Sequence, residues 1–167
     1  MHRVLLALIL ALTGTWAAGH APHQHGVAKL EVTIVGTELT LRLETPLDNL
    51  LGFEHAPRTA AQRTAAQRLL ERLRQGEALF QPTRAAVCRM QGVELTAPVL
   101  QDATAATEHA DLRAEWRFAC AEPGQLTDLR VNLFTDFPRL KRLDAAVASP
   151  RGQRARRLSA RMPDLAW

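Results

Sequence analysis

Hydrophobic and polar residues alternate along two neighbouring segments of the 167-residue chain. Apolar side chains occupy every second position over residues 28–34 and again over residues 39–43. Such a period of two is typical of strands that bury one face. Gly36 and Thr37 lie between the two segments, where a tight turn is expected. The pattern therefore predicts a β-hairpin over residues 27–45 with one apolar face.

A connector with prolines at positions 46 and 57 separates this hairpin from a segment with helical periodicity. Thr59 and Gln62 have the spacing of a capping box, in which each side chain binds the backbone N–H of the other residue. Apolar residues then recur at helical spacing until Gly76. We therefore expect one main helix between Thr59 and Gly76.

The second half of the chain carries mainly strand patterns. Strands are predicted over residues 86–99 with a bulge at Gly92, over 112–120, around Leu129, Val131 and Leu133, and over 143–149 and 154–159 as a last hairpin joined at 150–153. A polar connector, residues 101–111, separates the first two, and a turn is expected through Asp136 to Pro138. These patterns predict an α+β fold, with a single antiparallel β-sheet and one main helix packed on it.

The first residues have the composition of a secretory signal peptide. An uninterrupted apolar run over residues 4–12 is followed by small residues over 13–19, and the run is too short for a permanent membrane span. We expect cleavage near Ala17 to Gly19, which leaves an exported chain without a membrane span. The predicted organisation is a signal peptide, residues 1–19, and a single α+β domain, residues 20–167, with a flexible histidine-containing N-terminal leader.

The chain has two cysteines, Cys88 and Cys120. Export to an oxidising compartment favours a disulfide between them over two free thiols. Closing a loop of about 33 residues in this way contributes about 3 to 4 kcal/mol to stability. The two cysteines are far apart in sequence and lack the paired spacing of metal ligands, which argues against a cysteine metal site.

Three histidines, His20, His23 and His25, directly follow the predicted signal peptide and suggest a metal-binding N-terminus. Cleavage after Ala17 would make His20 the third residue, and a free amine, two amides and this imidazole could then hold copper or nickel in a square plane. Cleavage after Gly19 would remove that arrangement and leave His20 at most a peripheral ligand.

The formal net charge is +4 and comes mainly from arginine. Basic residues are concentrated near the end of the chain, at Arg139, Lys141, Arg142, Arg151, Arg154, Arg156, Arg157 and Arg161. This region is either a solvated basic end of the domain or a surface for an acidic partner or an anionic membrane. Export makes nucleic acid an unsuitable partner. No His-Glu-x-x-His helix, nucleophile elbow or phosphate loop occurs, so we do not expect an enzyme.

Several motifs together resemble the ZrgA-like family of bacterial periplasmic zinc-binding proteins. They are His-x-His-Gly at 23–26, Gly-Phe-Glu-His-Ala-Pro at 52–57, Glu-His-Ala-Asp at 108–111, Phe-Thr-Asp-Phe-Pro at 134–138, the capped helix and the two cysteines. The resemblance implies a periplasmic zinc-binding accessory protein that assists zinc uptake by an ABC-type importer. It also implies the zinc ion, and the importer's periplasmic solute-binding protein, as binding partners.

The metal ligands that the resemblance implies are His23, His25 and His109, with Glu108 and Asp111 beside the last of these. In an extended segment His23 and His25 project on the same side, so both can reach one ion. Zinc prefers four ligands. We therefore expect the leader to fold back on the 101–111 connector, where His109 supplies a third ligand and Asp111, Glu108 or water completes the set.

Each of these histidines also has a structural interpretation. His23 and His25 could belong to a merely polar leader, and His109 could be an ordinary loop histidine. His55 follows Phe53 in a proline-bounded segment, where an imidazole often binds backbone, so we favour a structural role over metal binding there.

Two further observations limit the functional prediction. Relatives often carry a long histidine- and acid-rich insertion in the connector, whereas here the connector has the single histidine His109. The same ligand types accept other divalent metals, since copper outcompetes zinc at most such sites. The alternative function is a periplasmic structural or protein-interaction module whose basic end and residues Leu165 and Trp167 dock a partner, with incidental or copper or nickel binding.

Overall fold

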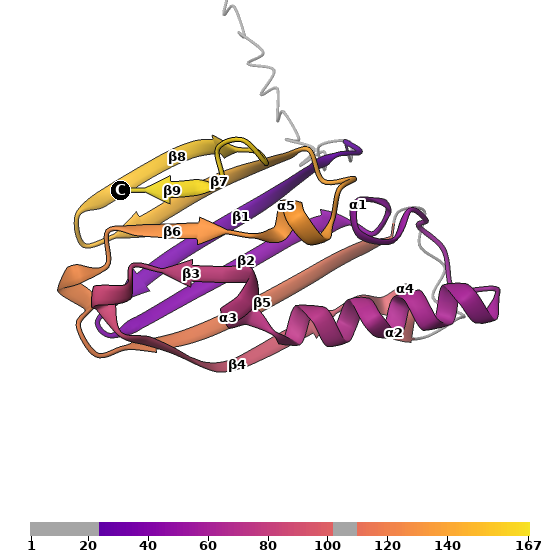
Figure 1. Ribbon diagram of the computed structural model, residues 1–167, viewed down its shortest axis with the longest axis horizontal. Coiled ribbons are helices and arrows are strands. Elements are labelled where there is room, and N and C mark those ends of the chain that lie inside the picture. Colours follow the sequence, from indigo (N-terminus) through magenta and orange to yellow (C-terminus); the bar gives the residue numbers. More distant parts are fainter. Residues whose placement is uncertain (1–23, 102–109) are drawn as a thin grey trace, which may run out of the picture.

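A computed structural model describes residues 24–101 and 110–167. Its largest element is a six-stranded sheet in the order β4-β5-β2-β1-β7-β8 (Figure 1). These strands are β1 (Val27–Val35), β2 (Glu38–Pro46), β4 (Cys88–Thr96), β5 (Asp111–Cys120), β7 (Arg142–Ser149) and β8 (Gly152–Leu158). A smaller sheet in the order β3-β6-β9 consists of β3 (Phe80–Pro82), β6 (Asp128–Val131) and β9 (Asp164–Ala166).

The predicted N-terminal hairpin is confirmed as the centre of the large sheet. β1 and β2 pair antiparallel, with Leu30 opposite Leu43 and Val32 opposite Leu41, and all four side chains are buried. The polar residues between them face the other side of the sheet, as the period of two requires. The hairpin thus divides the large sheet into a core face and a polar face.

The main helix α2 (Ala60–Arg74) covers the core face and confirms the predicted helix. Thr59 Oγ1 accepts a hydrogen bond from the backbone of Gln62, and the Gln62 side chain accepts one from the backbone of Thr59, so the capping box is present. Leu73 is fully buried, and its carbonyl accepts a 2.7 Å hydrogen bond from Nε1 of Trp116 on β5. This bond satisfies the buried indole N–H and fixes the helix to the sheet.

The prediction of one antiparallel sheet is wrong in two respects, although the α+β class is confirmed. β1 and β7 pair in parallel, so the large sheet is mixed. A parallel pair needs a long crossover, and the chain between β1 and β7 contains most of the fold. The second difference is the three-stranded sheet. Two of its strands, β3 and β9, have only three residues, which is too short for a periodic signal.

The other strand predictions are confirmed with shifted ends. The predicted bulge at Gly92 is present as a break in register between Met90 and Gly92. Leu133 was expected in a strand but begins helix α5, which precedes the predicted turn. The remaining short elements are α1 (Asp48–Leu51), α3 (Gly76–Leu79), η1 (Arg84–Ala86), α4 (Pro98–Gln101), η2 (Pro123–Gln125) and α5 (Leu133–Asp136).

The predicted disulfide between Cys88 and Cys120 is confirmed. The two cysteines are directly opposite each other, at the first position of β4 and the last of β5. The disulfide therefore closes one end of this strand pair, and the segment between α4 and β5 joins the strands at the other end.

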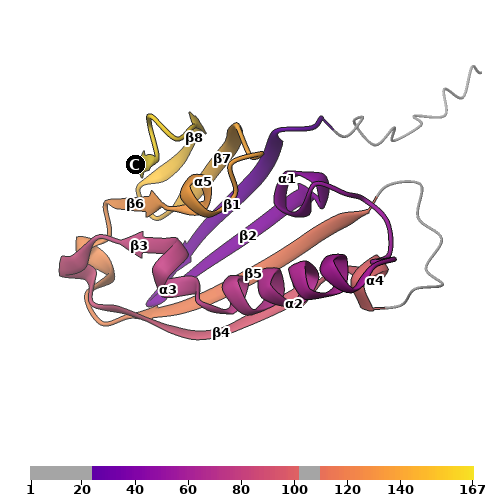
Figure 2. The same ribbon diagram turned by 45° about the vertical axis from the view of Figure 1, so that its right-hand side comes forward.

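Helix α2 and the small sheet lie on the core face of the large sheet, whereas no described element covers the polar face (Figure 2). Charges of alternating sign cross this polar face in register, in the order Arg113, Glu44, Lys29, Asp144, Arg157. On β2, two residues before Glu44, Arg42 donates a 2.7 Å hydrogen bond to Glu115 on β5. This hydrogen bond is the larger cause, and the negative charge of Glu115 the second, of a raised pKa of Arg42. The polar face is thus a surface of compensated charges.

Among the described glycines, Gly76, the first residue of α3, has the least room for a side chain. A Cβ atom here would lie 2.5 Å from Trp116 Cδ1 and 2.6 Å from Met90 Sδ. We expect Gly76→Ala to lower the free energy of unfolding by about 1 to 3 kcal/mol, because the buried indole must move. Gly124→Ala is the matched control, since no atom lies within 4 Å of its Cβ position. Urea unfolding measures the free energy of unfolding of both variants. Equal values for Gly76→Ala and Gly124→Ala would contradict the prediction.

Removal of the disulfide tests the closure of the β4–β5 pair. The cysteines are 32 positions apart, and loop-closure entropy predicts a loss of about 3 to 4 kcal/mol in Cys88→Ala/Cys120→Ala. Urea unfolding of the double variant and of the oxidised parent measures this loss. The parent in reductant lacks the disulfide but keeps both cysteines, so it controls for the effect of the substitutions themselves. An unchanged unfolding midpoint would show that the disulfide does not stabilise the fold.

Candidate metal centre

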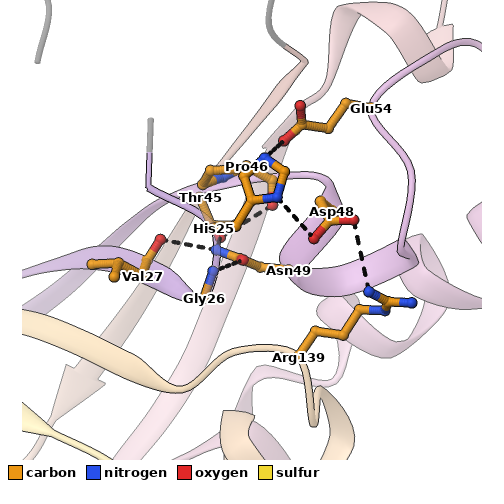
Figure 3. A network of polar contacts seen from close by, with 9 residues as sticks. All are labelled: His25, Gly26, Val27, Thr45, Pro46, Asp48, Asn49, Glu54 and Arg139. Atoms are coloured by element: carbon orange, nitrogen blue, oxygen red, sulfur yellow. Dashed lines mark hydrogen bonds and ion pairs between the residues drawn. The ribbon is translucent and has the colours of Figure 1, made fainter. Parts of the chain in front are cut away.

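One end of the large sheet brings together segments that are distant in sequence. β1 begins there at Val27, β2 ends there at Pro46, and β5 begins there at Asp111. Helix α1 directly follows β2, so Asp48 lies beside the residues that precede β1 (Figure 3). This end of the sheet therefore places His25 next to acidic residues from a different part of the chain.

A buried asparagine fixes the backbone next to His25. Asn49 is 1% exposed, and its side-chain Oδ1 accepts a 2.6 Å hydrogen bond from the backbone N–H of Gly26. Its Nδ2 donates to the carbonyl of Val27 at 2.8 Å and to Thr45 Oγ1 at 3.0 Å. The Asn49 amide thus binds the main-chain N–H of Gly26 and C=O of Val27, as the backbone of a neighbouring strand would. These bonds fix the backbone next to His25.

Gly26 contributes a second constraint. Its φ is +81°, a conformation that favours glycine, and its carbonyl accepts hydrogen bonds from the backbone of Lys141 and Arg142. A Cβ atom at this position would lie 3.3 Å from Lys141 Cγ. The glycine of the His-x-His-Gly motif is therefore required by the backbone turn next to His25.

The imidazole of His25 lies between two carboxylates, as Figure 3 shows. Its Nδ1 is 3.5 Å from Asp48 Oδ2, and its Nε2 is 3.4 Å from Glu54 Oε1. The His25 side chain is 64% exposed, whereas the Asp48 and Glu54 side chains are 19% and 24% exposed. An exposed nitrogen donor is thus held against half-buried acidic oxygens.

These separations suit the coordination of a metal ion. Two ligands that each lie close to 2 Å from a tetrahedral zinc ion are about 3.3 Å apart. Both nitrogen–oxygen pairs of His25 have nearly this spacing, but they lie on different edges of one ring. In the described ranges, no three His, Cys, Asp or Glu side chains are grouped so that they could hold one ion. Each pair therefore offers two donor atoms, fewer than the four ligands that zinc prefers.

The two carboxylates differ in their other contacts. Asp48 Oδ1 is also 3.8 Å from Nη1 of Arg139. The Arg139 guanidinium packs against Gly52, where a Cβ atom would lie only 2.9 Å from its Nε. The positive charge beside Asp48 makes this carboxylate a poorer metal ligand than Glu54, for which His25 is the one ion-pair partner within the described chain.

His55 makes contacts of a structural kind. Its Nδ1 is 2.9 Å from the carbonyl oxygen of Ala56, and its ring stacks on Phe53 with centroids 5.1 Å apart. A ring held in this way fits the backbone-binding role that the sequence suggested. Its Nε2 has no partner among the described residues.

The other predicted ligands are placed unevenly. His20, His23, Glu108 and His109 lie outside the described residues, as does the predicted signal peptide. Asp111 is described and lies opposite Pro46 at the first position of β5. Ala110, the residue between His109 and Asp111, is buried, and its carbonyl accepts a 2.9 Å hydrogen bond from the backbone of Leu47. The described end of the connector is thus bound to Leu47, the residue before Asp48.

Sequence reasoning missed Asp48, Asn49, Glu54 and Arg139 as parts of this site. Glu54 could have been found, because it lies within the Gly-Phe-Glu-His-Ala-Pro segment that carries the family resemblance. Asp48 and Asn49 lie in a short helix without a periodic pattern, and Arg139 is one of many arginines. Their roles depend on the fold, so no local signal marks them.

Comparison with known proteins gives a family match. No curated protein matches the chain. None of the helices in residues 24–101 and 110–167 combines the length and the apolar character that a bilayer crossing requires. A family model described as ZrgA family zinc uptake protein matches residues 22–167. Because this match covers most of the chain, the protein belongs to the ZrgA family of zinc uptake proteins.

Proposed function

We propose that this protein is a periplasmic zinc-binding accessory protein that assists zinc uptake by an ABC-type importer. The observation that carries the proposal is the His25 imidazole between Asp48 and Glu54 at the end of the large sheet. The family is associated with uptake of this metal rather than with catalysis. In this function zinc is cargo, and the protein binds it without chemical change.

Within the site, His25 Nε2 and Glu54 are the proposed ligands. Asp48 lies at the other edge of the ring, where its Oδ2 is 3.5 Å from Nδ1. A carboxylate in this position fixes the tautomer that leaves Nε2 free for the metal, as in many zinc sites where a ligating histidine is oriented from behind. The Arg139 guanidinium beside Asp48 supports this division of roles.

The remaining ligands are assigned to the predicted leader and connector. His23 precedes His25 by two positions, and His109 precedes Ala110, whose backbone is bound to Leu47 beside Asp48. Both histidines thus adjoin residues at the end of the sheet that carries His25. Asp111, Glu108 or water would complete the set, and His20 is a peripheral candidate.

The oxidised cysteines and the first residues support the proposed location. A disulfide favours an oxidising compartment, and the apolar run over residues 4–12 favours export and removal of residues 1–19. The exposure of His25 suits a protein that must release its ion to another protein, since a partner's ligands can reach the metal. The proposed recipient is the solute-binding protein of the importer.

Replacement of one histidine tests the site directly. We expect His25→Ala to weaken zinc binding by at least about a hundredfold, because loss of an orienting contact alone costs about ten- to a hundredfold. His55→Ala is the matched control and should change the affinity by less than about threefold, since its ring stacks on Phe53 and pairs with no carboxylate of the described residues, whereas His25 lies between Asp48 and Glu54. Isothermal titration of the exported protein measures both.

The same titration tests whether the connector takes part. His109→Ala should lower the zinc affinity without removing a separate second site, because one ion is shared between the leader and the connector. Unchanged affinity and stoichiometry in His109→Ala would contradict the shared site. Failure of the unsubstituted protein to retain zinc would contradict the proposed function and favour a structural or interaction module.

The roles of the two carboxylates can be separated. Asp48→Asn should weaken zinc binding by about tenfold through loss of ring orientation. Glu54→Gln removes a ligand and should weaken binding further. Glu44→Gln, on the polar face of the sheet, is the control for loss of one negative charge. Zinc titration and urea unfolding together measure the effects, and equal losses for Asp48→Asn and Glu54→Gln would contradict the assigned roles.

A further inference from the structure

Strand β8 is an edge of the six-stranded sheet and is unusually exposed. Its first six residues, 152–157, are exposed, and only its last residue, Leu158, is buried. Figure 1 shows β8 along the upper border of the molecule, paired with β7 on one side. The strand is therefore held mainly by its hydrogen bonds to β7 and by the burial of Leu158.

Both faces of β8 carry arginine. Arg154 and Arg156 are opposite Val147 and Ala145, so they project on the side of the sheet that carries the core. Both are exposed there, because the core ends before it reaches β8. Arg157 is opposite Asp144 and projects on the polar face. A row of guanidinium groups thus surrounds the outer edge of the strand.

The outer edge of β8 also presents main-chain groups. The two-residue turn between β7 and β8 makes Ser149 and Gly152 a hydrogen-bonded pair, and such pairs alternate along an antiparallel ladder. The N–H and C=O groups of Gln153, Ala155 and Arg157 therefore point away from β7. Within the described part of the chain, no hydrogen bond outside the strand ladder uses the main-chain groups of these three residues.

The charge on this edge is largely uncompensated. No acidic residue occurs in the sequence between Asp144 and Asp164. Arg154 and Arg156 pair with no carboxylate of the described residues. Arg157 is 3.8 Å from Asp144 Oδ1 and its side chain is 81% exposed. Arg151 is excluded from this edge, because it donates hydrogen bonds to the carbonyl groups of Leu126 and Gly124.

We propose that the outer edge of β8 binds an extended acidic segment of a partner protein as an additional strand. Main-chain groups of Gln153, Ala155 and Arg157 supply the ladder, and Arg154, Arg156 and Arg157 supply the charge that selects an acidic sequence. The proposal concerns a different surface from the metal centre and does not depend on zinc.

A second copy of this chain is a poor occupant of the same edge. Antiparallel pairing of β8 with β8 about Ala155 would place Arg154 of each copy directly opposite Arg156 of the other. Like charges directly opposite each other destabilise a strand pair. Charged edge strands commonly prevent self-association in this way. A strand with acidic side chains at these positions would instead be attracted to Arg154 and Arg156.

An anionic membrane also fits less well. A flat surface would approach one side of the sheet, whereas Arg154 and Arg156 lie on one side and Arg157 lies on the other. Lipid headgroups would also leave the regular spacing of the outward main-chain groups unused. An extended peptide satisfies both the charges and the backbone.

The probe is a fluorescein-labelled heptapeptide, Glu-Val-Glu-Thr-Glu-Val-Glu, titrated with the exported protein in chelator and low salt. We expect saturable binding by fluorescence anisotropy that weakens at least about tenfold in Arg154→Glu/Arg156→Glu and as salt rises to about 0.2 M. Arg68→Glu/Arg89→Glu, at two exposed arginines away from β8, is the charge-matched control and should bind nearly as well as the parent. The lysine counterpart of the peptide should not bind.

A second measurement distinguishes strand addition from charge attraction alone. Amide hydrogen exchange of the unsubstituted protein, followed by nuclear magnetic resonance, should slow at Gln153, Ala155 and Arg157 when the peptide is present. The proposal is overturned by absence of peptide binding, by equal binding to the β8 variant, or by binding without protection of these amides. Binding to phosphatidylglycerol vesicles but not to the peptide would overturn it in favour of a membrane surface.

Discussion

The side-chain amide of Asn49 holds together the part of the molecule on which the candidate site depends. It is buried, and its hydrogen bonds go to the backbone of Gly26 and Val27 and to Thr45. A buried amide that lost these partners would have a large desolvation penalty, so the contacts act as a unit. They connect α1 to the start of β1 and thereby set the distance from His25 to Asp48. The position of the imidazole thus follows from a buried neutral side chain rather than from the charges around it.

The topology of the sheet explains why this point of the molecule collects the proposed metal ligands. The start of β1, the end of β2 and the start of β5 coincide because the β1–β2 and β2–β5 pairs are antiparallel. Segments that leave or enter the sheet at this end include the residues before Val27, helix α1 and the residue Ala110. Polar side chains on such segments can face solvent without disturbing the core. The basic edge at β8 lies at a different border of the same sheet, so the proposed metal site and the proposed partner surface can be altered independently.

Apart from the disulfide, which follows from the presence of two cysteines, the features that the sequence predicted are those that depend on neighbouring residues. Thr59 and Gln62 specify the start of α2, and alternation specifies β1, β2 and β5, because both effects act within a few residues. The parallel pairing of β1 with β7 depends on residues far apart in the chain and leaves no local pattern. The site shows the same limit. His25 was predicted as a ligand from its motif, whereas Asp48 and Arg139 approach it only through the fold, and Glu54 was overlooked beside His55.

The covalent closure of β4 and β5 has a consequence for how this fold can vary in length. Cys88 and Cys120 hold the strand pair at the end remote from the connector, while α4 and the Ala110–Leu47 hydrogen bond anchor the chain on either side of residues 102–109. Doubling the length of a loop between anchored ends costs only about 0.6 kcal/mol of additional entropy. The register of the strands therefore does not rely on a short link, and sequence can be inserted or deleted between them at little thermodynamic cost. Such tolerance allows the length and composition of this connector to change while the sheet stays the same.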